Sequence, residues 1–163
     1  MQKEREVKMK STKLLITLGL GMLLASAVAM AENAMAGTWK LNASKSTISA
    51  GAQRNDTVKI EMDGDKMKIT VDGTDTAGKP VHTEWTGKDD GQEYPVTGDP
   101  NADMRSYKKS GDRSWAVTSK KGGKVTTSGT ITVSADGKTR TVKVKGTNAE
   151  GKPVHTNAVY EKQ

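Results

Sequence analysis

The stretch Asp63 to Thr83, DGDKMKITVDGTDTAGKPVHT, occurs twice in the chain. Its second copy, Asp136 to Thr156, reads DGKTRTVKVKGTNAEGKPVHT at a constant offset of 73 residues and without a gap. Weaker similarity on either side extends the repeat halves to 57–84 and 130–157. A gapless match of this length indicates two copies of one supersecondary unit.

Alternating apolar and polar residues predict that the first copy is a three-stranded antiparallel meander. Residues 57–62 and 66–72 alternate in this way on either side of Asp63-Gly64, a dipeptide typical of tight hairpin turns. A longer loop over 73–79 then leads to a third strand over 81–86. Such a meander presents one apolar face and one wet face.

The second copy follows the same order. Val125, Ile131 and Val133 share one phase of the alternation, and Asp136-Gly137 supplies the turn. The loop over 146–152 is then the counterpart of the first loop, either at the same end of the fold or at the opposite end. The repeat therefore predicts the strand phases of both halves.

Further short strands are expected over 37–41, 93–96, 104–109 and 114–119, which gives about eight to ten antiparallel strands in all. Closing such a sheet removes its exposed edges, so we predict an all-β, antiparallel, up-and-down β-barrel; a two-sheet sandwich is the alternative. One meander cannot bury its apolar face alone, so both halves are expected to share the core of a single domain, 32–163.

The leader, residues 1–31, has the three parts of a secretory signal peptide, expected to form a helix separate from the barrel. Lysines precede the apolar run 14–25, and Ala29-Met30-Ala31 is a small-x-small cleavage site; Met9 is a possible true start. Cleavage after Ala36 is the competing choice. The apolar run is too short for stable membrane insertion, so we expect a secreted or periplasmic protein.

Composition limits the classes of partner. Of the formal net charge of +7 over 163 residues, five basic and two acidic residues lie in the leader, so the mature chain carries +4. A net charge of this size is typical of an ordinary solvated protein surface, and no nucleic-acid partner is expected. The chain has no Cys, which excludes disulfides and thiolate metal sites, and no Phe. Val, Ile, Met and three Trp must therefore fill the core of an expected monomer.

The opening Gly37-Thr38-Trp39 resembles the first-strand signature of lipocalin-type (calycin) barrels. A longer pattern, 37–42 with Lys45-Ser46 and 93–103, is similar to a group of small secreted bacterial proteins with no assigned activity. The resemblance implies that Trp39 packs against a basic side chain from a late strand, for which Arg140 is the candidate. The chain departs from true lipocalins in having no disulfide and no aromatic-rich interior, and no catalytic residue carries over.

The resemblance and the strand count together predict a barrel that binds a small apolar or amphipathic ligand non-covalently, without enzymatic activity or a cofactor. The residues expected to line the ligand site share an apolar or aromatic character and an interior phase; they are Trp39, Met67, Trp85, Tyr107 and Trp115. The alternative is a filled barrel that acts as a structural or envelope-interaction protein through its loops.

The sequence also contains two candidate metal sites. His82 and His155, the only histidines, occupy equivalent repeat positions and would bind a metal if the two copies brought them together. Asp99, Asn101 and Asp103 have oxygen side chains at a spacing found in calcium loops. The simpler interpretation is that the histidines lie on the wet face of their strands and that the acidic loop only makes capped turns.

Overall fold

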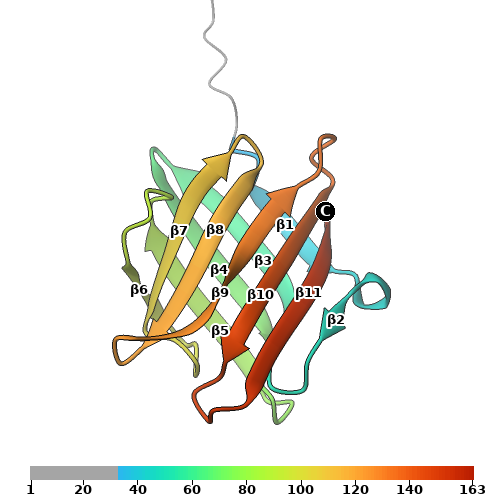
Figure 1. Ribbon diagram of the computed structural model, residues 1–163. Coiled ribbons are helices and arrows are strands. Elements are labelled where there is room, and N and C mark those ends of the chain that lie inside the picture. Colours follow the sequence, from blue (N-terminus) through green and yellow to red (C-terminus); the bar gives the residue numbers. More distant parts are fainter. Residues whose placement is uncertain (1–32) are drawn as a thin grey trace, which may run out of the picture. The chain divides into compact units, whose positions relative to one another are not determined.

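Successive hairpins build the part of the chain that the structure describes, residues 33–163 of a computed structural model (Figure 1). Ten antiparallel strands close into an up-and-down barrel, in chain order except that β11 returns to β1. The ten are β1 (Gly37–Leu41), β3 (Arg54–Asp63), β4 (Lys66–Thr74), β5 (Pro80–Gly87), β6 (Tyr94–Thr97), β7 (Met104–Gly111), β8 (Ser114–Lys121), β9 (Lys124–Val133), β10 (Thr139–Thr147) and β11 (Pro153–Lys162). The expected signal peptide, 1–31, lies outside the described residues.

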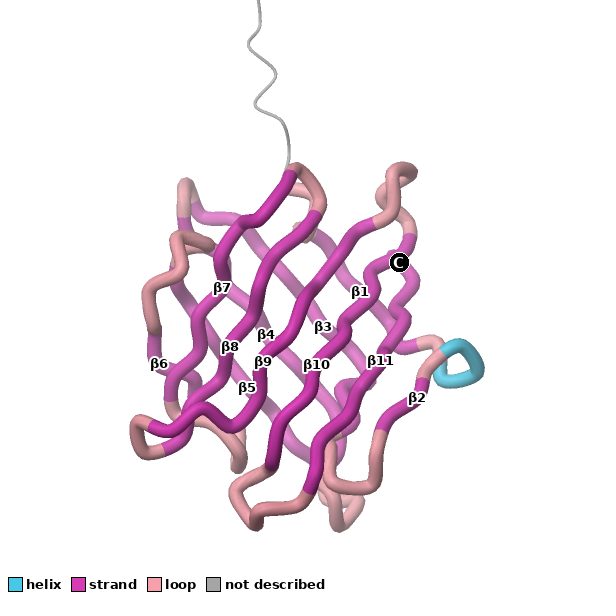
Figure 2. Tube along the Cα trace, viewed as in Figure 1, coloured by secondary structure: helices cyan, strands magenta, loops and turns pink. Residues whose placement is uncertain are grey.

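The barrel closes where the first strand meets the last. Trp39 to Leu41 of β1 pair in register with Tyr160 to Lys162 of β11, and β1 pairs with β3 on its other side. A single-turn 3-10 helix, η1 (Ala43–Lys45), then leads to β2 (Thr47–Ile48), which continues along the start of β11 (Figure 2). Closure confirms the predicted all-β barrel and excludes the two-sheet alternative. No helix within residues 33–163 is long and apolar enough to span a membrane.

Side chains alternate between the interior and the solvent along β4, as the sequence predicts. On β4, Met67, Ile69 and Val71 are buried, whereas Lys66 and Lys68 are exposed. Burying one such apolar side chain stabilises the fold by roughly 1.5–3 kcal/mol. The buried apolar side chains of both halves belong to one cluster.

Val125 departs from the predicted phase. It was expected to face inward with Ile131 and Val133, but its side chain is 55% exposed. The pairing between β8 and β9 shifts at this point, because Ser119 pairs with Thr127 while Lys120 pairs with Val125. The residue left over, Thr126, is a β-bulge that turns its own side chain inward and reverses the phase of Val125.

Large side chains fill one end of the barrel, which we call the tryptophan end. Trp39, Trp85, Trp115, Met35 and Met67 are all fully buried there. Each indole N–H has an acceptor: Nε1 of Trp39 donates to the Met35 carbonyl oxygen over 2.8 Å, and Trp85 and Trp115 donate to Arg105 O and Asp89 Oδ2. Tryptophan, methionine and branched residues thus supply a core without phenylalanine, and the indole groups bury no unpaired donor.

The two repeat loops emerge at the same end, opposite the tryptophan end (Figure 1). Their hydrogen bonds match. Asp75 N donates to Lys79 O over 2.9 Å, and Asn148 N donates to Lys152 O over 2.9 Å. Gly78 and Gly151 both have φ of 78°, a left-handed conformation that glycine adopts without strain. The choice that the sequence left open, one end or two, is thereby decided in favour of one end.

Candidate functional site

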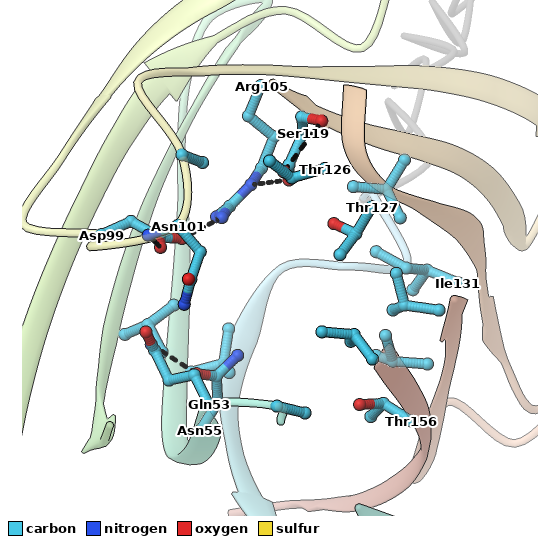
Figure 3. Close-up of a pocket in the computed structure, with 18 of the residues that line it drawn as sticks. Gln53, Asn55, Asp99, Asn101, Arg105, Ser119, Thr126, Thr127, Ile131 and Thr156 are labelled. Carbon is cyan, nitrogen blue, oxygen red and sulfur yellow. Dashed lines mark hydrogen bonds and ion pairs between the residues drawn. The ribbon is translucent and has the colours of Figure 1, made fainter. Parts of the chain in front are cut away.

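The barrel contains a cavity whose lining includes residues directly beside the tryptophans, such as Tyr107 against Trp85 (Figure 3). The cavity has a volume of about 150 Å³, and its walls come from β3, β4 and β7 to β11. Its apolar lining consists mainly of branched side chains, which include Val58, Ile69, Val71, Val117, Ile131 and Val142. Polar side chains line the cavity toward the end of the barrel opposite the tryptophan end. They include Gln53, Asn55, Ser119, Thr126, Thr127 and Thr156. The cavity thus has an apolar wall and a polar outer part.

Three loops cover the polar end of the cavity: residues 49–53, 98–103 and 148–152, here called the mouth loops. They are tied to one another by two hydrogen bonds. Nδ2 of the buried Asn148 donates to Gly51 O over 3.1 Å, and Ala149 N donates to Asn101 Oδ1 over 3.1 Å. Because residues from all three loops line the cavity, a molecule entering from this end has to pass between them.

Arg105 lies at the polar side of the cavity and is neutralised by Asp99 (Figure 3). Its guanidinium donates to Asp99 Oδ2 over 2.5 Å and to Ser119 Oγ over 3.0 Å. The two side chains are 14% and 9% exposed. Burial alone would lower the pKa of Arg105, but contributions from Tyr107 and Asp99 outweigh it and raise that pKa. Arg105 is therefore a paired charge that holds the 98–103 loop against β7.

Arg140 lies in the same cavity without such a partner. Its side chain is only 4% exposed, and no carboxylate of the described residues forms an ion pair with it. Its Nε has no hydrogen-bond partner. Burial lowers the pKa of Arg140, and nearby Tyr160 and Tyr107 only partly oppose this. Arginine still stays protonated in proteins, so the barrel interior contains an uncompensated cation.

Two tyrosines flank this cation. The guanidinium of Arg140 lies over the Tyr160 ring, 5.3 Å from its centroid, and Tyr107 also lines the cavity. Burial raises the pKa of Tyr160 to about 12, so its hydroxyl remains protonated at neutral pH. The site therefore offers guanidinium and phenol donors beside an apolar wall, a combination that suits an anion attached to an apolar body.

The structure divides the five predicted ligand-binding residues between two places. Tyr107 lines the cavity. Trp39, Met67, Trp85 and Trp115 are fully buried in the tryptophan end and are not among the residues that line the cavity. The expected pairing of Trp39 with Arg140 is also different, because Lys162 Nζ lies over the Trp39 ring at 5.4 Å.

Sequence reasoning missed Arg105 and Arg140 as cavity residues. The signal for Arg140 was present: it precedes Val142 and Val144 at a spacing of two, so it shares their inward phase on β10. A charged residue in an apolar phase is a departure that marks either a buried pair or a binding site. For Arg105, nothing in the sequence identified Asp99 as its partner.

The predicted calcium ligands are each held by nitrogen donors. Asp99 Oδ1 accepts from Asn101 N over 2.8 Å, Asn101 Oδ1 accepts from Ala149 N, and Asp103 Oδ2 accepts from Gly122 N over 2.8 Å. Within residues 33–163, no cluster of three or more His, Asp or Glu side chains has the geometry to hold a metal ion. Calcium binding here stays a prediction, whereas the turn-capping role of these side chains is visible.

The two histidines lie on the outer face of the barrel. His82 on β5 donates through Nδ1 to Asp72 Oδ1 over 2.6 Å, and Nε2 lies 3.6 Å from Glu84 Oε1. His155 on β11 lies in a shallow outer depression with Lys143 and Lys145. Since β1, β3 and β4 separate β5 from β11, the fold does not bring the two imidazoles together.

Comparison of the chain with protein-family models and with curated proteins finds no match. The site is therefore interpreted from its own geometry.

Proposed function

We propose that this protein is a secreted or periplasmic, lipocalin-like barrel that binds one small amphipathic molecule non-covalently in its cavity. The observation that carries the proposal is the cavity, with its branched apolar lining, polar end and tied mouth loops. A protein interior packs to the density of an organic crystal, so an unfilled space of this size needs an explanation. A ligand supplies one.

The volume limits the part of the ligand that is enclosed. A cavity of about 150 Å³ is near that of an engineered apolar cavity that holds benzene, and it is below the roughly 300–1,000 Å³ of drug-sized pockets. The enclosed part is then on the order of six to ten non-hydrogen atoms. A longer molecule would extend between the mouth loops or displace them.

Two features favour a lipocalin-like relationship. Trp39 lies on the first strand, fully buried at the closed end, and a basic side chain from the last strand, Lys162, covers its ring. The ten strands close in the same up-and-down order as the eight strands of lipocalin barrels, which hold one small ligand. The step from fold to function is an analogy, so the cavity and not the fold is the basis for the ligand.

The competing proposal is a structural or envelope-interaction protein without a ligand. Native mass spectrometry of the protein purified from the envelope or medium of its own source decides between the two. A small molecule retained on the folded barrel supports the ligand proposal. If the spectrum shows only the bare chain and no small amphipathic molecule raises the melting temperature, the structural alternative holds.

A pair of variants tests whether the retained molecule lies in the cavity. Val142→Phe adds a ring at the cavity wall, and we expect it to abolish the adduct. Val125→Phe makes the same change at an exposed position on the neighbouring strand and should retain the adduct. An adduct that survives Val142→Phe would place the ligand outside the cavity.

A further inference from the structure

We infer that the cavity recognises the carboxylate group of a small amphipathic monoanion, with the guanidinium of Arg140 as its anchor. The inference rests on the proposed ligand-binding function and names the chemical class of the ligand. It starts from Arg140, which is 4% exposed, lines the cavity and has an Nε without any hydrogen-bond partner. Buried polar groups in folded proteins are nearly always paired, and buried charges almost always are.

The charge count inside the cavity favours a single negative charge. The two cations that line the cavity are Arg105 and Arg140, and the one carboxylate that lines it is Asp99. Asp99 is committed to Arg105, so one positive charge remains. A monoanion neutralises this charge, whereas a phosphate monoester, with about 1.5 to 2 negative charges near neutral pH, would leave an excess of buried negative charge.

The available donors match the shape of a carboxylate. A guanidinium is a planar fork that binds a carboxylate through two parallel N–H···O bonds. Tyr107 and Tyr160 line the same cavity and add O–H donors. The Tyr160 ring lies against the Arg140 guanidinium and limits its freedom to reorient. An anchor that is already immobile loses less entropy when the ligand binds.

The rest of the cavity suits a short apolar tail. Val58, Ile69, Val117 and Ile131 line it together with the arginine, so a molecule held at Arg140 has branched apolar side chains around its body. The enclosed volume allows on the order of eight non-hydrogen atoms, about the size of a six-carbon acid. Short-chain or compact organic acids are therefore the expected ligand class.

The test compares head groups on one tail. Hexanoate, 1-hexanol, hexylamine and hexyl phosphate are titrated by calorimetry and NMR into the mature chain that begins at residue 32. We expect hexanoate to bind at least about 30-fold more tightly than 1-hexanol, since a desolvated charge pair has a coupling of that order. Hexyl phosphate should be weaker than hexanoate, and hexylamine should not bind.

The variant arm assigns the preference to Arg140. Arg140→Met should reduce hexanoate affinity by at least about 30-fold while changing 1-hexanol affinity less than about 3-fold. Arg140→Lys retains the charge but loses the planar fork of the guanidinium. Its affinity for hexanoate should therefore lie between those of the wild type and Arg140→Met. Near-ultraviolet circular dichroism of the buried tryptophans reports whether each variant is folded. The comparison of head groups on the wild type tests the inference even if a variant does not fold.

The outcomes separate this inference from the proposed function. If the wild type binds 1-hexanol as tightly as hexanoate, the cavity binds ligands but the carboxylate assignment is overturned. The same conclusion follows if hexyl phosphate binds most tightly, or if folded Arg140→Met retains hexanoate. If the folded wild type binds none of the four probes, both the inference and the proposed binding function are overturned.

Discussion

The guanidinium of Arg140 lies over the aromatic ring of Tyr160, with 5.3 Å between its central carbon and the ring centroid. The two residues are direct cross-strand partners on β10 and β11. A cation over an aromatic face gains up to about 2 kcal/mol when both are desolvated. Removing a guanidinium from water costs several kcal/mol, so this contact does not offset the burial of Arg140. The burial of Arg140 therefore leaves a net electrostatic cost in the folded barrel.

Replacing Arg140 with methionine should stabilise the ligand-free protein. An apolar side chain of similar length fills the same space without a desolvated charge, and replacing buried ionic groups by apolar ones is often neutral or stabilising by up to about 4 kcal/mol. Urea denaturation monitored by tryptophan fluorescence measures the change. Arg113→Met, at an exposed position, is the matched control and should lie within about 0.5 kcal/mol of the wild type. A marked loss of stability in Arg140→Met would mean that the guanidinium has favourable partners in solution.

Replacing Asp99 with asparagine should destabilise the protein by about 3 kcal/mol. The change leaves Arg105 buried beside its former partner without a counter-charge, and a half-removed buried pair is costly. Glu150→Gln breaks the exposed ion pair with Lys152 and should cost less than about 1 kcal/mol. Adding Arg105→Met to Asp99→Asn should recover much of the loss. If the double variant is no more stable than Asp99→Asn, the buried charge is not the cause.

The strands and their inward faces could be predicted from the sequence because apolar and polar residues alternate along them. Met67, Ile69 and Val71 face inward as their phase requires, because the pleat of a strand places successive side chains on opposite faces. Val125 fails because a bulge changes the phase, and a bulge depends on how two strands pair. Alternation within one strand contains no information about that pairing.

The candidate site was less predictable than the barrel. Large apolar residues such as Trp39 and Trp115 were expected to contact a ligand, yet large side chains are also the ones that fill space, and here they pack the closed end. The cavity has no tryptophan and no methionine in its lining. Its main polar feature, the unpaired state of Arg140, depends on which carboxylates lie nearby in three dimensions, and no local pattern specifies that.

The single substitutions Asn148→Asp and Asp75→Asn should affect the two repeat loops differently. Both side chains cap their own loop, but only Asn148 also donates through Nδ2, to Gly51 O. Asn148→Asp replaces that donor with a carboxylate facing a carbonyl oxygen and should cost about 1–3 kcal/mol. Hydrogen exchange should also be faster in the mouth loops.

Asp75→Asn is the reciprocal control for that exchange. Asp75 lies in an exposed loop, and its capping bonds are available to an asparagine, so the change should stay within about 0.5 kcal/mol. Equal effects of the two substitutions would show that Asn148 does not tie the mouth loops together.

His82 should contribute stability at acidic pH that is lost as the pH rises. The hydrogen bond to Asp72, with a smaller contribution from Glu84, raises the pKa of His82 above its ordinary value. The contribution is therefore complete below the unfolded-state pKa of about 6.5 and disappears as the pH passes the raised folded-state value. Melting temperatures of wild type and Asp72→Asn should differ most below the unfolded-state pKa of about 6.5 and converge as the pH rises past the folded-state pKa. A constant difference across this range would contradict the assignment.

The position of Met35 predicts where the mature chain begins. Met35 is fully buried in the tryptophan end, and its carbonyl oxygen accepts the Nε1 hydrogen of Trp39. Signal cleavage after Ala31 retains this residue, whereas cleavage after Ala36 removes it. Losing it would open a cavity and leave a buried N–H unpaired, at a combined cost on the order of 3–6 kcal/mol. We therefore expect Glu32 at the amino terminus, as measured by intact mass.

Recombinant chains that begin at residue 32 and at residue 37 test the same point in vitro. The shorter chain should unfold at a markedly lower denaturant concentration, and Met35→Ala in the longer chain should account for about 2–5 kcal/mol of the difference. Met35→Leu, which nearly conserves volume, should cost less than about 1.5 kcal/mol. A mature protein that begins at Gly37 and is as stable as the longer chain would show that the barrel closes without Met35. Because Met35 belongs to the same core cluster as the tryptophans, its removal would loosen the packing beside the cavity.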